Sequence, residues 1–187
     1  MDDTRLGLFI MLGQEAERQV LEHPSVVPPE SLLISHSYDL ATVLPGQVRR
    51  ASSAALVYKL FFVFENFLRE LVFDVLSEKD KVNWWGKVPK HIQDDVEYLE
   101  KNEETKAWMS LGSRDKLSLT TYSQLLAIID EGWKSGFEAV IRDKSLVQSA
   151  RHVAHLRNAI CHMTDIPPEE TERIRQVIRD WFRMVSP

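Results

Sequence analysis

Apolar residues recur at steps of three and four along most of this chain, which is the spacing of one face of an α-helix. The most apolar segment, residues 47–79, is apolar nearly all round at its centre, and this predicts a buried central helix. Its apolar stripe consists of Val57, Leu60, Phe61, Phe64, Leu68, Leu71 and Val75. Few runs alternate between apolar and polar residues, and the chain has only 7 glycines, so we predict an all-α fold.

The same spacing predicts further helices on both sides of this segment. We expect them at about residues 3–22, 30–43, 89–102, 144–163 and 168–185, with two short helices that meet near Gly132. Pro45-Gly46 is expected to end the helix over 30–43. We therefore predict an N-terminal helical extension over residues 1–46 and a helical domain over residues 47–187, which together form one compact unit.

Two polar residues interrupt the apolar stripe of the helix predicted over 144–163. Its apolar positions are Leu146, Val147, Ala150, Val153, Ala154, Ile160 and Cys161. Continuing their steps of three and four leads to Arg157 and Asn158, which therefore fall on the face expected to be buried. Because an unpaired guanidinium is costly to bury, Arg157 needs either an acidic partner or a water-filled cleft. His162 follows in the last turn, four residues after Asn158.

Glu65 is the obvious acidic partner for Arg157, because it lies in "LFFVFENFLRELV" at the heart of the predicted central helix. Arg69 comes four residues after Glu65 and is within reach of it on the same helix, so Glu65 has two candidate partners. From the residues alone, two interpretations of Arg157 stay open. It is either one half of an ion pair that holds helices together or part of a functional site.

Composition and charge narrow the class of protein. Hydrophobic residues make up 44% and charged residues 27% of the chain, as in ordinary globular proteins. A net charge of −5 argues against a protein that coats nucleic acid by bulk electrostatics, although residues 142–162 are locally basic. No stretch is apolar for long enough to span a membrane, and the acidic first residues are unlike a signal peptide, so we expect a cytoplasmic protein.

The sequence offers little to bind a metal. A single cysteine, Cys161, excludes an internal disulfide and a cysteine-rich zinc module. His152 and His155 have the spacing of two ligands on a helix, but no third ligand of suitable spacing accompanies them. We therefore expect no metal site.

Several segments together resemble the HEPN superfamily (higher eukaryotes and prokaryotes nucleotide-binding domains). "RNAICH" is similar to the R-N-x-x-x-H signature of that superfamily, and "FENFLREL" is similar to its earlier core helix, which carries a glutamate followed by a basic residue. "YSQLLAIIDEGW" also resembles one HEPN branch, and the likeness covers residues 50–185. The resemblance implies an all-α, HEPN-like helical bundle with short accessory helices, and usually a homodimer.

The resemblance also implies an activity, since many HEPN domains are metal-independent ribonucleases in toxin–antitoxin, anti-phage and RNA-processing systems. RNA is then cleaved by attack of the ribose 2′-hydroxyl on the adjacent phosphate, without metal or other cofactor. The implied catalytic residues are Arg157 for the phosphate charge, His162 for proton movement and Asn158 for orientation. The implied supporting residues are Glu65 and Arg69. Candidate RNA contacts are Lys144, Arg151 and His155.

Two functions remain open, and the intact Arg157, Asn158 and His162 favour the first. The first is a HEPN-type endoribonuclease acting on RNA as a homodimer, as a toxin or anti-phage defence component with an antitoxin or a larger defence complex as partner. The second is a HEPN-fold module that binds RNA, nucleotide or a protein partner without cleaving and that mediates dimerisation. We expect no membrane partner for either.

Overall fold

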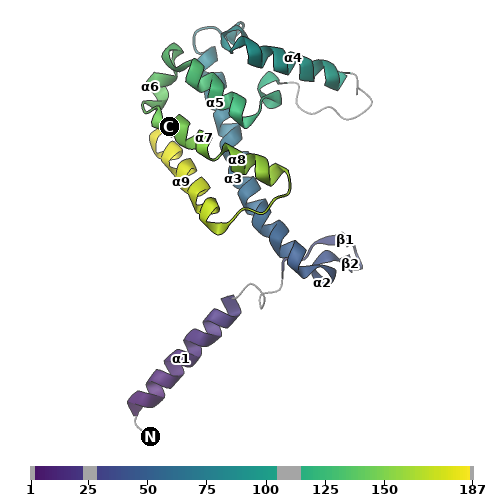
Figure 1. Ribbon diagram of the computed structural model, residues 1–187, viewed down its shortest axis with the longest axis vertical. Coiled ribbons are helices and arrows are strands. Elements are labelled where there is room, and N and C mark those ends of the chain that lie inside the picture. The colour runs from purple at the N-terminus through teal and green to yellow at the C-terminus, as the bar shows by residue number, and fades with distance from the viewer. Residues whose placement is uncertain (1–2, 23–28, 105–114, 186–187) are drawn as a thin grey trace. The chain divides into compact units, whose positions relative to one another are not determined.

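The structure is a computed structural model, and it describes residues 3–22, 29–104 and 115–185. Helices dominate these residues, which confirms the predicted all-α fold (Figure 1). The α-helices are α1 (Asp3–Glu22), α2 (Leu40–Val43), α3 (Pro45–Ser77), α4 (Lys90–Glu104), α5 (Tyr122–Glu131), α6 (Phe137–Ile141), α7 (Ser145–His152), α8 (Ala154–Cys161) and α9 (Pro168–Val185). The 3₁₀-helices are η1 (Trp84–Lys87), η2 (Lys116–Leu119) and η3 (Trp133–Ser135).

The chain divides into two compact units, Met1–Ser53 and Ala54–Pro187. Helix α3 crosses from one to the other without a break, and the predicted division at residue 46 stays a prediction. Pro45 begins α3 and does not merely end the element before it, because its fixed φ and missing N–H suit the first position of a helix.

In the first unit, the prediction of a helix over 30–43 is wrong for most of that range. Strands β1 (Leu33–Ser35) and β2 (Tyr38–Asp39) form an antiparallel hairpin there, and only α2 is helical. Asp39 explains the difference, because its carboxylate accepts hydrogen bonds from the Ser31 hydroxyl (2.8 Å), the Leu32 N–H (2.9 Å) and the Ala41 N–H (2.8 Å). The same side chain therefore ties the hairpin together and caps α2.

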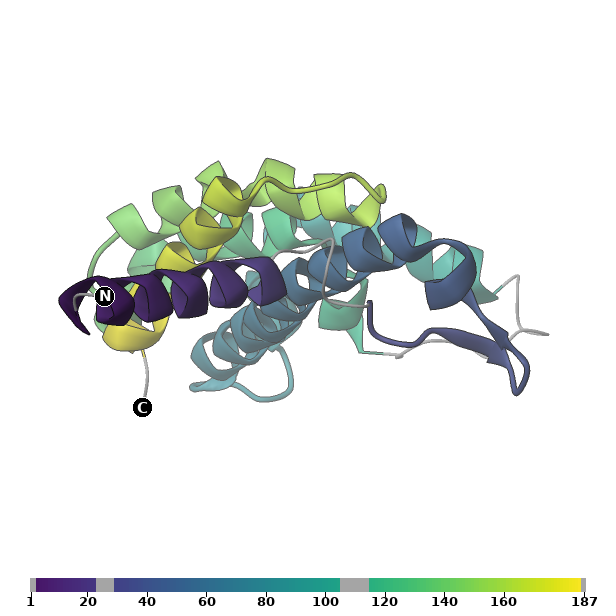
Figure 2. The same cartoon turned by 90° about the horizontal axis from the view of Figure 1, so that it is seen from below.

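In the second unit, the central part of α3 supplies the core. Every residue of its predicted apolar stripe is buried or half-buried. Phe61 packs edge-on against Tyr122 of α5, with ring centroids 5.8 Å apart, and Phe64 packs in the same way against Trp181 of α9, at 5.5 Å. Helix α7 packs against both α5 and α9, and Figures 1 and 2 show α7 beside α9.

Helix α3 is not buried all round, which corrects the prediction. Among its apolar residues, Leu56, Tyr58, Phe62, Val63 and Phe73 are exposed. Within the described residues, α3 is also the one helix whose length and composition would allow it to cross a membrane, a test that the core helix of a soluble protein passes as well. Part of its apolar surface packs against α5 and α9 through Phe61 and Phe64.

The helix predicted over 144–163 is two helices, α7 and α8, separated by a turn at the buried Val153. The buried hydroxyl of Tyr122 donates to the Ala150 carbonyl at 2.9 Å, and the Val153 N–H donates to the same carbonyl at 3.3 Å. That oxygen would accept the Ala154 N–H in an unbroken helix, so the tyrosine competes with the helical ladder. The break ends the continuous stripe, and Asn158, expected to be buried, is exposed.

Candidate functional site

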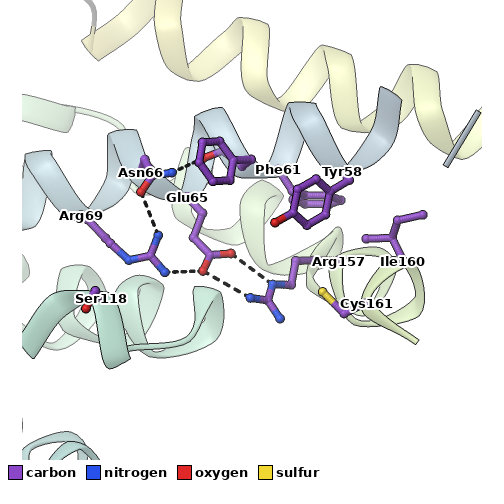
Figure 3. A pocket seen from close by; sticks show the side chains of 10 residues that line it. Tyr58, Phe61, Glu65, Asn66, Arg69, Ser118, Arg157, Ile160 and Cys161 are labelled. Atoms are coloured by element: carbon purple, nitrogen blue, oxygen red, sulfur yellow. Dashed lines mark hydrogen bonds and ion pairs between the residues drawn. The ribbon is translucent and has the colours of Figure 1, made fainter. Parts of the chain in front are cut away.

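Glu65 of α3 is a buried acid that binds two arginines (Figure 3). Its Oε2 accepts from Nε of Arg157 at 3.1 Å, and its Oε1 accepts from Nη2 of Arg157 at 3.3 Å. The same Oε1 accepts from Nη2 of Arg69 at 2.5 Å. Arg69 and Arg157, the two candidate partners of Glu65 in the sequence, therefore bind it at the same time. Two cations around one anion leave this cluster with one net positive charge in an acidic protein.

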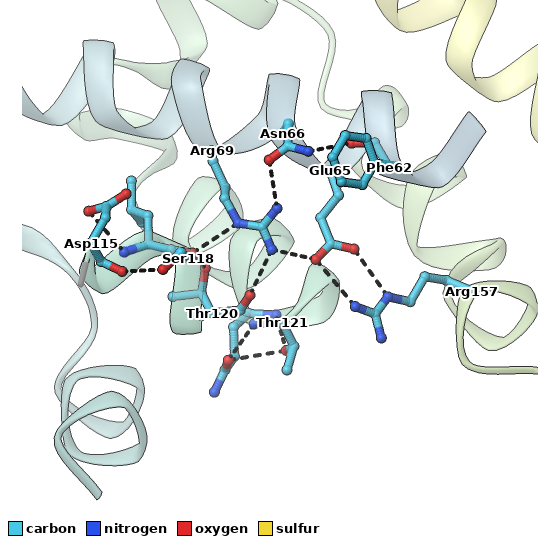
Figure 4. A network of polar contacts seen from close by, with 11 residues as sticks. Phe62, Glu65, Asn66, Arg69, Asp115, Ser118, Thr120, Thr121 and Arg157 are labelled. Carbon is cyan, nitrogen blue, oxygen red and sulfur yellow. Dashed lines mark hydrogen bonds and ion pairs between the residues drawn. The ribbon is translucent and has the colours of Figure 1, made fainter. Parts of the chain in front are cut away.

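Every nitrogen of the Arg69 guanidinium has a hydrogen-bond partner within the protein (Figure 4). Besides Glu65, it donates to the Leu117 carbonyl (2.9 Å), the Thr120 carbonyl (3.2 Å) and the side-chain oxygen of Asn66 (3.3 Å). These bonds fasten η2 and the residue after it to α3. Arg69 is thus a structural clamp that also orients Glu65.

Arg157 of α8 keeps part of its guanidinium unoccupied. Nε and Nη2 face Glu65, whereas Nη1 has no hydrogen-bond partner among the described residues and points away from the carboxylate (Figure 3). Burial disfavours the charged form of Arg157, but the hydrogen bonds and charge of Glu65 outweigh burial and raise the pKa of Arg157 above its usual value. Arg157 is therefore a permanent cation whose position is fixed by Glu65.

A pocket of about 250 Å³ opens beside this cluster. Its lining residues are Tyr58, Phe61, Phe62, Glu65, Asn66, Arg69, Ser118, Arg157, Ile160 and Cys161. Arg157 is half-buried at this pocket, with 26% of its side chain exposed, so an anion entering from solvent can reach it. The arrangement suits a phosphate, which a guanidinium binds through two parallel hydrogen bonds.

Asn158 and His162 do not line this pocket. Helix α8 ends at Cys161, and His162 follows it as an exposed residue whose backbone N–H bonds to the carbonyls of Asn158 and Ala159, both at 3.1 Å. The structure thus brings Arg157, Glu65 and Arg69 together and leaves the other two motif residues on the surface. Their catalytic roles stay predictions.

The three candidate RNA contacts lie outside the pocket as well. Lys144 Nζ lies 2.6 Å from Oδ1 of Asp130, and Arg151 Nη1 lies 2.7 Å from Oδ2 of the same residue. The hydrogen bond from Lys144, aided by Arg151, lowers the pKa of Asp130 below its ordinary value. His155 is exposed. Lys144 and Arg151 therefore have a structural partner, and their contact with RNA stays a prediction.

Sequence reasoning missed two aromatic residues of the pocket, Tyr58 and Phe62. Both lie on the row of α3 that carries Glu65 and Arg69, because the four positions follow one another at steps of four, three and four. Extending this row backward from Glu65 would have found them. The apolar character of the segment over residues 47–79 predicted a buried helix instead.

The described residues contain no group of three or more His, Cys, Asp or Glu side chains placed to hold a metal ion. Comparison with curated proteins and with solved structures gives no significant match. The sequence model of one family, Swt1-like HEPN, matches residues 59–186. The match covers most of the chain and includes the Glu65 cluster and the whole "RNAICH" motif. This chain therefore belongs to the Swt1-like HEPN family.

Proposed function

We propose that this protein is a metal-independent endoribonuclease of HEPN type, which cleaves RNA by attack of a ribose 2′-hydroxyl on the adjacent phosphate. One observation carries the proposal: at a pocket that Arg157 lines, Glu65 fixes Arg157 through two nitrogens while the third nitrogen points away from Glu65. A fixed cation of this kind stabilises the charge that develops on a phosphate under attack. The "RNAICH" motif adds Asn158 and His162 directly after it in sequence.

His162 has the chemistry for the proton transfer, since a histidine changes its charge near neutral pH. It lies outside the pocket that Arg157 faces in its own chain. We therefore propose that the working enzyme is a homodimer in which two α8 helices meet, so that a cleft shared by both copies holds two arginines and two histidines. A role in a toxin–antitoxin or defence system rests on the family resemblance, and a cytoplasmic location stays a prediction from the sequence.

Cleavage of RNA by the purified protein in EDTA tests this function. We expect the wild type to cut single-stranded RNA and leave 2′,3′-cyclic phosphate ends, because the 2′-oxygen is the nucleophile. His162→Ala is expected to lower the rate at least about 100-fold, the lower range for loss of a general acid or base. His91→Ala, an exposed histidine on α4, is the matched control and should cut like the wild type. Equal cutting by His162→Ala would contradict the proposal.

The proposed homodimer is tested by separate measurements of mass and of activity. Sedimentation velocity at micromolar concentration should give the mass of two chains for the wild type. Mixing Arg157→Ala with His162→Ala should then restore part of the activity if the cleft combines residues of both copies. A monomer with full activity would remove the shared cleft from the mechanism.

A second function is favoured by the exposed positions of Asn158 and His162 and by the net charge of −5. In this alternative, the domain binds RNA, nucleotide or a protein partner without cutting. Wild type that binds RNA in EDTA but leaves it intact would support this function over the first.

A further inference from the structure

Two neighbouring aromatic side chains of α3 are exposed at the pocket. Tyr58 is 54% exposed and Phe62 is 57% exposed, and their ring centroids lie 6.1 Å apart. Both line the pocket that Arg157 and Glu65 also line. Large exposed aromatic surface is unfavourable in water, so a pair of this kind beside a charged site points to a ligand that covers it.

The pair adjoins the cation of the site. Figure 3 shows Tyr58 with its hydroxyl end turned toward the Glu65–Arg157 pair. A phosphate bound at Arg157 would therefore have an aromatic surface next to it.

A second pocket next to the first is acidic, and its charge is unfavourable for an anionic chain. This pocket, of about 790 Å³, shares Asn66, Arg69 and Ser118 with the first. Its lining includes three acids, Glu70, Asp74 and Asp115, while its one cation, Arg69, is occupied by the protein. A nucleic-acid strand whose phosphate sits at Arg157 would be repelled there and would run along Tyr58 and Phe62 instead.

We propose that Tyr58 and Phe62 form a stacking platform for a nucleobase next to the phosphate held by Arg157, and that the substrate is single-stranded RNA. This platform rests on the proposed function, in which RNA is the ligand of the pocket. An unpaired base can leave its neighbours and stack on an exposed aromatic ring, whereas a base within a duplex is already stacked. Stacking of this kind tolerates any base, so the platform provides affinity and strand selection more than sequence preference.

Binding of uncut RNA tests the platform. The probe is a fluorescein-labelled single-stranded RNA of about eight nucleotides with 2′-O-methyl riboses, which cannot attack the phosphate. A second probe has the same backbone with abasic sugars in place of the bases. Fluorescence anisotropy in EDTA should show wild type binding the first probe about 10-fold more tightly than the second, within the range for one stacked base.

Phe62→Leu and Tyr58→Leu should each weaken binding of the base-containing RNA by about 5- to 10-fold and leave binding of the abasic RNA within about twofold of wild type. Tyr98→Leu removes an exposed aromatic residue of α4 outside both pockets and should change neither affinity. Circular dichroism melting checks that each variant is folded, as expected for exposed positions.

The platform is overturned if the two leucine variants bind the base-containing RNA as wild type does, if they weaken both probes equally, or if wild type binds neither probe. It is also overturned if Phe62→Leu converts a dimer into a monomer without a base-specific loss, because the aromatic pair would then cover a second copy of the chain. The proposed function fails separately, through absence of cutting of 2′-hydroxyl RNA by wild type, whatever the anisotropy shows.

Discussion

Two carboxylates in the second unit are each shared by two cations, and their different surroundings give the two clusters different roles. Glu65 binds Arg69 and Arg157, and only 8% of its side chain is exposed. Asp130 binds Lys144 and Arg151, with 21% of its side chain exposed and both cations open to solvent. The Glu65 cluster adjoins an aromatic-lined pocket, whereas Asp130 lines neither of the two pockets described above and joins α5 to α7 through Arg151.

The difference shows that a shared acid does not by itself make a site. Around Asp130, both cations are directed to the carboxylate from the surface, and solvent screens their attraction. Around Glu65, one arginine is held by backbone carbonyls and the other keeps Nη1 unbonded within the described chain. Burial of the acid and an unoccupied donor at a pocket are what separate a candidate phosphate site from a surface clamp.

The largest contrast is expected from replacing one arginine of each cluster by lysine. Arg157→Lys keeps the charge but removes the planar fork that reaches Glu65 and a phosphate together, so RNA cleavage in EDTA should fall about 100-fold or more. Arg151→Lys should lower the same rate by less than about threefold, because an exposed lysine still pairs with Asp130. Similar losses in the two variants would mean that the Glu65 cluster is no more a site than the Asp130 cluster.

A smaller contrast is expected in stability when each acid is neutralised. Glu65→Gln leaves two half-buried arginines without a counter-ion, and the free energy of unfolding should fall by about 2–3 kcal/mol. Asp130→Asn should lower it by about 0.5–1 kcal/mol, the usual range for a solvent-screened pair. Urea unfolding followed by circular dichroism measures both. Equal losses would contradict the distinction between a buried and a surface cluster.

The elements that the sequence predicted well are those whose pattern is local. The long helix from Pro45 to Ser77 and the last helix, Pro168–Val185, show helical spacing over many turns, and neither needs a distant partner to define it. The break at Val153 could not be predicted in this way, because it depends on the hydroxyl of Tyr122, 28 residues away from the carbonyl it binds. The hairpin likewise depends on one carboxylate, Asp39, bonding backwards to Ser31 and Leu32.

The candidate site could also be predicted only where the sequence pattern is local. The position of a charged residue, Arg157, on an apolar stripe was enough to predict a partner, and Glu65 was the right one. That prediction extended the stripe to Asn158 across an assumed straight helix, so the turn at Val153 made this half of it wrong. The occupation of Arg69 by the Leu117 and Thr120 carbonyls has no signature in sequence, since backbone acceptors leave no residue pattern.

The smallest effect is expected in the pH dependence of the Asp130 cluster. The hydrogen bond from Lys144, with Arg151, holds the pKa of Asp130 below the ordinary 3.8 in the folded protein. The unfolded chain therefore takes up a proton at higher pH than the folded chain, so the contribution of Asp130 to stability is present above 3.8 and is lost as pH falls through the lowered value. The difference in unfolding free energy between wild type and Asp130→Asn, less than about 1 kcal/mol at neutral pH, should shrink toward zero in that acidic window. A difference that persists below the window would mean that the aspartate stabilises α5 and α7 through its shape and neutral hydrogen bonds, and the cluster would then be no ionic clamp.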